Sequence, residues 1–298
     1  MPIPYMGSKR KSAGKIYQTI KNFNPHADIL VDLFCGGFAI SEYFLKNGYK
    51  IIANDKNKYV IELIKKVIKD GLPEQVFDFI PREKFYDIKK NPKNYDDWFV
   101  GFSICIYSFG NQQQYYLFKK NVEKYKKAGH EFVMNKNAEL LETIGVKIPK
   151  KIKEKFNKIE KWQKRRMAFI KIHRIIFPKI RELQELQQLE SLQRLEQLQQ
   201  LEQKVSFSSE DYRKIKIPVG AIVYCDPPYQ GTKEYMEKGF QHDVFWDWVR
   251  KKSKTNKLYV SEYEAPEDFK KVLEFEQKST LCQGTAKNTK NECLFTLI

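Results

Sequence analysis

The sequence predicts an α/β protein with a mostly parallel sheet that carries an inserted, mainly helical domain. A strand, a glycine turn and a helix follow one another over residues 29–45, as at the start of an open α/β sheet. A later apolar strand stops abruptly at an acid and two prolines. Between residues 83 and 204 the α/β alternation is lost, and Lys, Gln, Tyr and Phe dominate. We therefore expect a core of residues 1–82 and 205–298 that is interrupted by 83–204.

The later strand leads directly into the most informative motif of the chain. An apolar run ends at Tyr224, and the chain then continues through Cys225 into Asp226-Pro227-Pro228-Tyr229. Proline lacks the N–H that a central strand needs, so the motif should lie just past the carboxyl end of the strand, where open α/β sheets bind ligands. Such a stiff turn would present a carboxylate, free carbonyls and a ring to a planar molecule with an exocyclic amine. Taken alone, the motif could also be a rigid loop without chemistry.

The glycine turn narrows the choice of cofactor. Residues 32–37 read Asp-Leu-Phe-Cys-Gly-Gly, which matches neither the dinucleotide-binding nor the phosphate-binding glycine pattern, so neither NAD nor ATP is expected. Together with Asp-Pro-Pro-Tyr, this turn resembles the S-adenosylmethionine-dependent DNA adenine-N6 methyltransferases of the Dam-like branch (D12 class). The resemblance implies a Rossmann-like methyltransferase fold, S-adenosylmethionine as the methyl donor, no metal, and the Asp226–Tyr229 motif as the catalytic residues. The chain departs from the family at Phe38, where many members carry a second glycine.

The resemblance also assigns residues to the donor pocket. The segment from Tyr5 to Lys9 resembles a part of the family that contributes to that pocket. Asp55 ends the second predicted strand, where an acid can accept from both ribose hydroxyls, although a helix N-cap is the alternative. Asp211 and Tyr212 match a pair that borders the adenine of the donor, with an N-cap and a core tyrosine as the alternative. The residues expected to bind the donor are Tyr5, Met6, Gly7, Lys9, Asp32, Phe34, Gly36, Asp55, Asp211, Tyr212 and Asp226.

The charge of the chain favours a nucleic-acid partner. Its formal net charge is +17, from 54 Lys and Arg against 37 Asp and Glu, which suits a polyanion, although a Lys-rich surface is the alternative. Within the insertion, amide side chains can read adenine edges and basic ones can contact phosphates. For any single residue the alternatives are a polar loop beside core aromatics and a solvated surface charge. We expect double-stranded DNA as the partner, with a cognate restriction endonuclease as a further candidate. The residues expected to bind DNA are Asn111, Gln112, Gln113, Lys164, Arg165 and Arg166.

A leucine repeat closes the insertion. Leucine recurs at every third residue from 183 to 201, with Gln and Glu between, inside a low-complexity segment 182–204. Three residues turn an α-helix by about 300°, so the leucine stripe should drift, no seam should persist for more than a few turns, and heptad coiled-coil geometry is not met. We expect a long or partly ordered helix that is peripheral to the chemistry. Packing against another subunit is the alternative, and a monomer is favoured.

Other features restrict the class of protein. The five cysteines form no Cys-x-x-Cys pair and the four histidines are dispersed, so neither a zinc site nor a disulfide framework is expected. Neither a signal peptide nor an apolar run of about 20 residues is found, so a cytoplasmic, nucleoid-associated protein is expected. Glu262-Tyr263 stands where Dam-like enzymes often carry Ser-Asn, and no role follows for Glu262.

The sequence therefore predicts a site-specific methyltransferase that modifies N6 of a flipped-out adenine in double-stranded DNA. A restriction–modification role and a solitary role are equally compatible with it. The alternatives are a methyltransferase acting on cytosine N4 or on RNA, and an inactive DNA-binding relative. An aspartate in the first position of the motif favours adenine, where a serine would favour cytosine.

Overall fold

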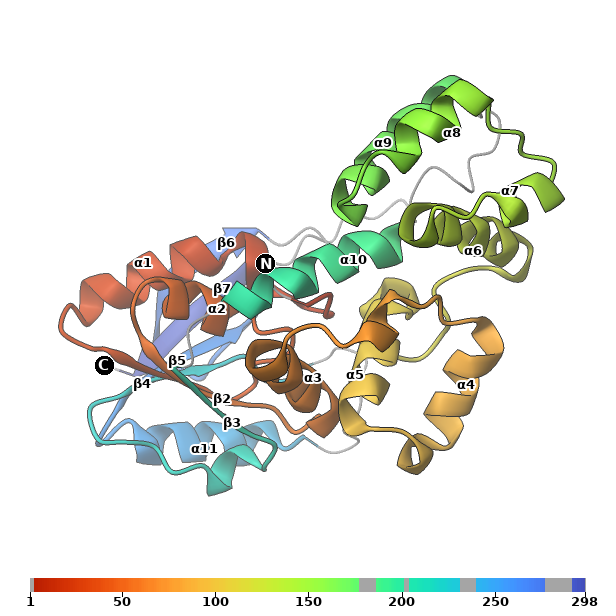
Figure 1. Ribbon diagram of the computed structural model, residues 1–298. Coiled ribbons are helices and arrows are strands. Elements are labelled where there is room, and N and C mark those ends of the chain that lie inside the picture. The colour runs from red at the N-terminus through yellow and green to blue at the C-terminus, as the bar shows by residue number, and fades with distance from the viewer. Residues whose placement is uncertain (1–2, 177–185, 201–203, 231–239, 277–290, 298) are drawn as a thin grey trace.

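The structure is a computed structural model that describes residues 3–176, 186–200, 204–230, 240–276 and 291–297. Its centre is a seven-stranded sheet of order β3-β2-β1-β4-β5-β7-β6, in which β7 alone runs antiparallel to its neighbours (Figure 1). The prediction of an α/β protein with a mostly parallel sheet is confirmed. The strands are β1 (Ile29–Asp32), β2 (Lys50–Asn54), β3 (Val205–Ser208), β4 (Ile222–Cys225), β5 (Lys257–Glu262), β6 (Phe269–Glu276) and β7 (Asn291–Leu297).

Alternation along the strands builds two cores, one on each face of the sheet. In β1, Leu30 belongs to one core and Val31 to the other, as expected when successive side chains point to opposite faces. The first core is covered by α1 (Ala13–Phe23), α2 (Ala39–Lys46) and α3 (Lys58–Asp70), and the second by α11 (His242–Lys252). Figure 1 shows α1 and α2 on one side of the sheet and α11 on the other. The carboxyl ends of β1, β2, β4 and β5 consequently meet at one edge.

The first helices of the predicted insertion belong to this core. After α4 (Arg82–Lys90), helix α5 (Asp97–Ile106) packs on α3, and its residues from Val100 to Ile106 are buried. The two helices touch so closely that a Cβ on Gly101 would lie 2.0 Å from the carbonyl oxygen of Tyr59. Packing between α3 and α5 thus crosses the boundary predicted at residue 83, which stays a prediction.

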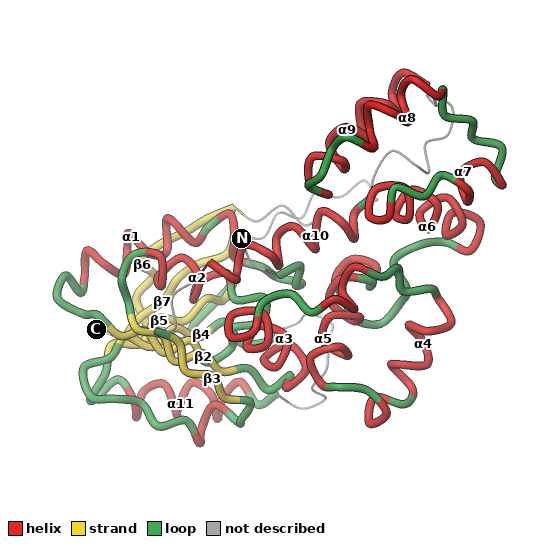
Figure 2. Tube along the Cα trace, in the orientation of Figure 1, coloured by secondary structure: helices red, strands yellow, loops and turns green. Residues whose placement is uncertain are grey.

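A group of helices stands apart from the sheet. It contains α6 (Lys120–Asn135), α7 (Glu139–Thr143), α8 (Lys150–Asn157) and α9 (Trp162–Ile176), and Figures 1 and 2 show it projecting beyond α5 and α10. Phe132 of α6 stacks on Phe156 of α8, with ring centroids 4.2 Å apart and an interplanar angle of 16°. Phe169 of α9 completes this aromatic contact. These rings fill the inside of the projecting part. They belong to the same continuous core as the residues on the first face of the sheet.

The leucine repeat contributes to the core. Helix α10 (Gln187–Glu196) continues as a 3-10 turn (Gln197–Gln200) that packs on α3, while α10 also contacts α5. A 3-10 helix has three residues per turn, so a three-residue repeat keeps to one face there. The drift expected for an α-helix fits the contacts, because α10 contacts α5 while the 3-10 turn that follows it packs on α3. The leucines at 183 and 201 lie outside the described residues, and the buried ones are Leu186, Leu189, Leu192, Leu195 and Leu198.

Short 3-10 turns complete the described secondary structure. They are η1 (Lys9–Lys11), η2 (Glu74–Phe77), η3 (Pro92–Asn94), η4 (Phe109–Asn111) and η7 (Tyr212–Lys214). Within the described ranges, no helix has both the length and the apolar character needed to cross a membrane.

Candidate active site

The glycine turn after β1 lies beneath the N-terminal segment. The N–H of Ile3 donates to the carbonyl of Gly37 at 3.0 Å. A Cβ on Gly36, whose φ is +43°, would lie 2.8 Å from Cδ1 of Tyr5, and a Cβ on Gly37 would lie 2.5 Å from the carbonyl oxygen of Ile3. Only glycine leaves room for this contact. The structure thus brings the predicted residues Tyr5 and Gly36 together, and Met6 and Gly7 form the turn that follows Tyr5.

Asp55 fixes the same turn from the neighbouring strand. Its Oδ2 accepts from the N–H of Gly36 at 2.8 Å, and its Oδ1 accepts from the N–H of Asn57 at 2.9 Å. The side chain of Asn57 in turn caps the first turn of α3 by accepting from Tyr59. Asp55 therefore holds the glycine turn to the start of α3. The ribose contact predicted for Asp55 stays a prediction.

Asp32 is buried at the carboxyl end of β1. Its Oδ2 accepts from the hydroxyl of Ser41 at 2.7 Å, whereas Oδ1 receives no hydrogen bond from the described residues. Burial raises the pKa of Asp32 to about 7, against the opposing hydrogen bond from Ser41. An unsatisfied carboxylate oxygen at a strand end suits a ligand with a donor group. Ser41 was not found by sequence reasoning, because a lone serine in a helix carries no motif.

Asn54 is a second residue that sequence reasoning missed. Its Nδ2 donates to the carbonyls of Leu33 and Glu210, each at 3.0 Å, and its Oδ1 accepts from the N–H of Glu210 at 3.0 Å and from the hydroxyl of Ser208 at 2.9 Å. One buried amide thus ties together the ends of β1, β2 and β3. The predicted donor-binding pair that follows Glu210 is positioned by it.

That pair, Asp211 and Tyr212, lies close to the segment that follows β1, through a contact between Tyr212 and Phe34. The ring of Tyr212 contacts that of Phe34, with centroids 5.5 Å apart, and meets Trp248 of α11 edge to face at 5.0 Å. Asp211 accepts from the N–H of Arg213 at 2.9 Å and so caps η7. Hydrogen bonds from Arg213 lower the pKa of Asp211 to about 2. The N-cap that the sequence left as an alternative is therefore present, and Tyr212 and Phe34 together form an aromatic wall.

Asp226 follows β4 and meets Lys9 from the N-terminal segment. Lys9 Nζ lies 2.8 Å from Asp226 Oδ2 and 3.6 Å from Glu292 Oε2, and it donates to the carbonyl of Gly7 at 3.0 Å. Asp226 Oδ1 receives no hydrogen bond from the described residues. Burial raises the pKa of Asp226 while Lys9 opposes the rise, and for Lys9 the two carboxylates outweigh burial and raise its pKa. Lys9 thus holds one oxygen of Asp226, the other oxygen is buried with no donor at hydrogen-bond distance among the described residues, and the side chain of Tyr229 interacts with the same carboxylate and lowers its pKa.

The Asp-Pro-Pro-Tyr motif lies just past the end of β4, as its two prolines predict. Lys9 Nζ stands 4.9 Å from the ring centroid of Tyr229. The ring of Tyr263 meets that of Tyr229 edge to face, at 4.8 Å and 82°. Pro227 and Pro228 set the backbone between Asp226 and Tyr229. The carboxylate and the ring are therefore both fixed relative to Lys9.

Two further carboxyl groups, Glu262 and Glu292, close the site. Glu262 ends β5 with 2% of its surface exposed, and Glu292 lies on β7 with 4% exposed. Burial raises the pKa of each to about 7. Across the described ranges, no group of three or more His, Cys, Asp or Glu side chains is arranged to hold a metal ion.

The predicted DNA-binding amides divide between two environments. The side chain of Gln113 accepts from Asn57 Nδ2 at 2.9 Å and hydrogen-bonds the hydroxyl of Tyr5. It therefore faces the donor pocket, which does not fit the base contact predicted for it. Gln112 is partly exposed, and Asn111 ends η4.

The predicted basic cluster on α9 is also divided. Arg165 is 7% exposed, and its guanidinium donates to four backbone carbonyls of α6 and of the turn before α9, those of Val133, Met134, Ile159 and Glu160. This buried bonding does not fit the phosphate contact predicted for Arg165. Arg166 bonds Gln193 and Glu190 of α10. Lys164 remains exposed.

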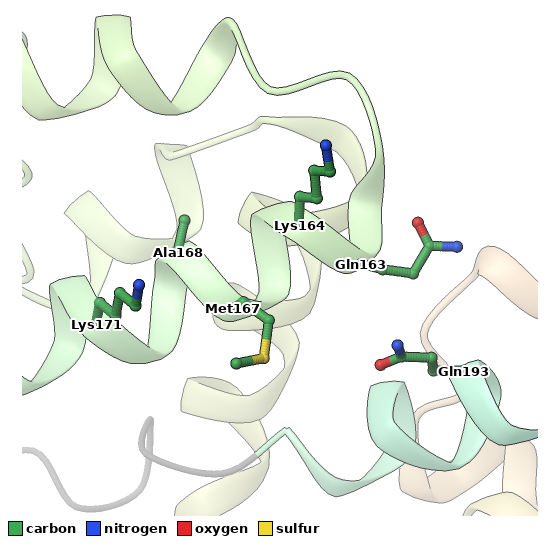
Figure 3. Close-up of a pocket in the computed structure, with 6 residues that line it drawn as sticks. All are labelled: Gln163, Lys164, Met167, Ala168, Lys171 and Gln193. Atoms are coloured by element: carbon green, nitrogen blue, oxygen red, sulfur yellow. The ribbon is translucent and has the colours of Figure 1, made fainter.

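A shallow pocket of about 400 Å³ lies beside Lys164, between α9 and α10 rather than at the strand ends. Figure 3 shows Lys164 and Lys171 projecting from α9, with Met167 between them and Gln193 on α10 opposite. Met167 is 52% exposed. This surface combines two cations with an adaptable apolar side chain, which suits contact with a polyanion.

Phe38 is the residue at which the chain departs from the glycine pattern. The structure shows why a large side chain is kept there and allows the backbone strain at this position to be tested. Its φ is +70°, a left-handed conformation, yet its side chain is fully buried and contacts the ring of Phe207 at 5.8 Å. We expect Phe38→Ala to destabilise the protein by roughly 3 to 5 kcal/mol. Phe38→Gly should cost about 1 kcal/mol less, because glycine relieves the left-handed strain. Urea unfolding of both variants measures the difference.

The control for this prediction is Phe44, which is equally buried but lies inside α2. There the order should reverse, with Gly about 1 kcal/mol worse than Ala, because glycine is unfavourable within a helix. The same order at both positions would contradict the strain at Phe38.

Asp32 predicts a dependence of stability on pH. Its folded pKa of about 7 lies above the ordinary value of 3.8, so the folded state holds this proton more tightly than the unfolded state. The wild type should therefore lose stability as the pH rises from about 4 to about 7. Asp32→Asn removes this loss, so the free energy of unfolding of the variant should gain roughly 2 to 3 kcal/mol on the wild type between pH 5 and pH 8. Parallel pH dependences in urea would contradict the raised pKa.

Comparisons with known proteins agree with this geometry. The D12 class N6 adenine-specific DNA methyltransferase family matches residues 5–266. The type II methyltransferase M.FokI of Planomicrobium okeanokoites is 33% identical to this chain over 90 residues. That match spans 30% of this chain and 13% of the relative. The family match includes the glycine turn, the helical insertion and the Asp-Pro-Pro-Tyr motif, and the chain belongs to the D12 class N6 adenine-specific DNA methyltransferase family.

Proposed function

We propose that this protein transfers a methyl group from S-adenosylmethionine to N6 of an adenine that is flipped out of double-stranded DNA. The observation that carries the proposal is the carboxylate of Asp226. Lys9 holds its Oδ2 at 2.8 Å, while Oδ1 is buried with no donor at hydrogen-bond distance among the described residues, and Tyr229 lies close enough to interact with the same carboxylate. An acceptor prepared in this way matches a ligand with an N–H donor, and the family supplies the exocyclic amine of adenine.

The proposed donor pocket lies between the glycine turn and the segment above it. The Oδ1 of Asp32 offers a second buried acceptor, and the rings of Phe34 and Tyr212 offer an apolar wall. S-adenosylmethionine would supply an electrophilic methyl group there. The residues proposed to hold it are Tyr5, Met6, Gly7, Lys9, Asp32, Phe34, Gly36, Asp55, Asp211, Tyr212 and Asp226.

Four residues are proposed to act on the target base. The N6 lone pair is delocalised into the ring, and hydrogen bonds from the amine to Asp226 and to the carbonyl of Pro227 would favour a tetrahedral nitrogen. The bound donor would supply the methyl group to this nitrogen and leave as a thioether with the S–C bonding electrons, and the nitrogen would release one proton to solvent. Positioning and electrostatics carry such a reaction. Pro228 stiffens the turn, and Tyr229 would stack on the base.

Base flipping is part of the proposal because the amine of a base stacked within the duplex could not reach the buried carboxylate of Asp226. Extrusion of a base costs roughly a few kcal/mol. Stacking on an aromatic ring recovers about 1 to 3 kcal/mol of this cost. The ring of Tyr229 is held by Lys9 and Tyr263 and is therefore already oriented before DNA binds.

The projecting helices are proposed to contact DNA. Lys164 is the exposed member of the predicted basic cluster, and Lys171 lines the same surface. Gln112, and Asn111 in the same loop, remain proposed base contacts. The name of the relative, a type II methyltransferase, favours a restriction–modification role with a cognate endonuclease as partner.

The central prediction concerns Asp226. Asp226→Asn keeps the shape of the side chain but removes its charge, and we expect transfer of labelled methyl to unmethylated genomic DNA to fall by at least about a thousandfold. DNA and donor binding should change little. Asp268→Asn, an exposed carboxylate paired with Arg250, is the control and should remain active.

Analysis of the modified nucleoside completes this test. N6-methyladenine made by the wild type supports the proposal, and N4-methylcytosine would overturn the substrate. A fully active Asp226→Asn variant would overturn the role of the carboxylate.

A second prediction concerns the DNA surface. Removal of one phosphate contact should lower the magnitude of the slope of log affinity against log salt by roughly 0.9. We expect this for Lys164→Ala. Lys257→Ala is the matched control, because Lys257 is an exposed lysine at the opposite, amino end of β5. Equal slopes for the wild type and Lys164→Ala would show that Lys164 contacts no phosphate.

A further inference from the structure

We infer that Glu262 is the positioning residue that fixes the ring of Tyr229 for stacking on the target base. This inference rests on the proposed function and deepens it. Glu262 stands where Dam-like enzymes often carry Ser-Asn, so the family pattern gives no role to a carboxylate there.

The carboxylate of Glu262 fastens both chain segments that flank Tyr229. Its Oε1 accepts from the N–H of Gln230, the residue after Tyr229, at 2.8 Å. Its Oε2 accepts from the N–H of Tyr263 at 2.7 Å. One side chain thus joins the end of the Asp-Pro-Pro-Tyr turn on β4 to the end of β5.

Both attachments converge on the same ring. Gln230 fixes the backbone directly after Tyr229, and the rings of Tyr263 and Tyr229 meet edge to face with centroids 4.8 Å apart. Lys9 stands over Tyr229 as well, at 4.9 Å. Without Glu262, the backbone N–H groups of Gln230 and Tyr263 would lose their acceptor, and two of the three contacts that restrain the ring would loosen.

Glu262 is itself held firmly enough for this task. It is 2% exposed and lies within the sheet, where it pairs with Cys293 of β7. His242 Nδ1 of α11 lies 3.9 Å from its Oε1. Charge-assisted bonds to backbone N–H groups are stronger than neutral ones, and a carboxylate is the one side chain whose two oxygens can both accept from such groups.

The test is Glu262→Gln, which keeps the volume of the side chain. Its amide nitrogen would face one of the two N–H donors, so one bond is lost and a donor–donor contact replaces it. We expect kcat for methyl transfer to genomic DNA to fall about tenfold, while the Kd for S-adenosylmethionine and the KM for DNA change less than twofold. Glu42→Gln, a buried carboxyl on α2, is the matched control and should keep its kcat.

A double-mutant cycle with Tyr229→Ala, measured under single-turnover conditions, shows whether Glu262 acts through the ring. Once the ring is absent, Glu262→Gln should cost less than twofold more. An unchanged kcat in Glu262→Gln, or an undiminished tenfold loss in the Tyr229→Ala background, would overturn this inference while the wild type remains a methyltransferase. A wild type that transfers no methyl group would instead refute the proposed function.

Discussion

The buried ion pair between Lys9 and Asp226 is the interaction on which the site depends. It connects the first described turn of the chain to a strand end more than two hundred residues later. Taking both charges out of water is expensive, and the pair offsets this cost only because Gly7 and Glu292 satisfy the remaining donors of the ammonium group. The N-terminal segment is consequently held over the glycine turn, and the proposed donor pocket is bordered by a part of the chain that belongs to no strand of the sheet.

The dependence of the site on contacts between distant segments explains how much of it could be predicted from the sequence. Asp226, Tyr229, Asp32 and the glycine turn follow from local rules, because prolines end strands and glycines permit close contacts. Leu30 and Val31 are adjacent and both apolar. Because successive strand residues point to opposite faces, they likewise predict a strand buried on both faces. Contacts between residues that are far apart in the sequence have no such local signal. The contacts of Asn54 with Glu210, or of Glu262 with Gln230, depend on which strand ends meet, and only the sheet order fixes that.

The errors have a physical origin too. Arg165 reads as a surface cation in the sequence, yet a guanidinium can be buried when backbone carbonyls take up its five donors. Gln113 reads as a DNA-reading amide, yet it turns inward to Asn57 and Tyr5. In both cases the residue type indicated strong hydrogen bonding correctly, and the fold decided the partner. As a result, the loop that holds Gln113 touches the donor pocket and the segment that carries Lys9 at the same time.

The buried leucine repeat has a consequence for how this gene can change. A tandem three-residue repeat can gain or lose a unit without shifting the reading frame, and in a solvent-exposed tract such changes would pass unnoticed. Here the five described leucines of the repeat are buried, in a segment that packs on α5 and α3. One added unit would lengthen an α-helix by about 4.5 Å and a 3-10 helix by about 6 Å, which would displace the strand that follows. The packing of the core therefore limits how many copies of the three-residue unit this segment can hold.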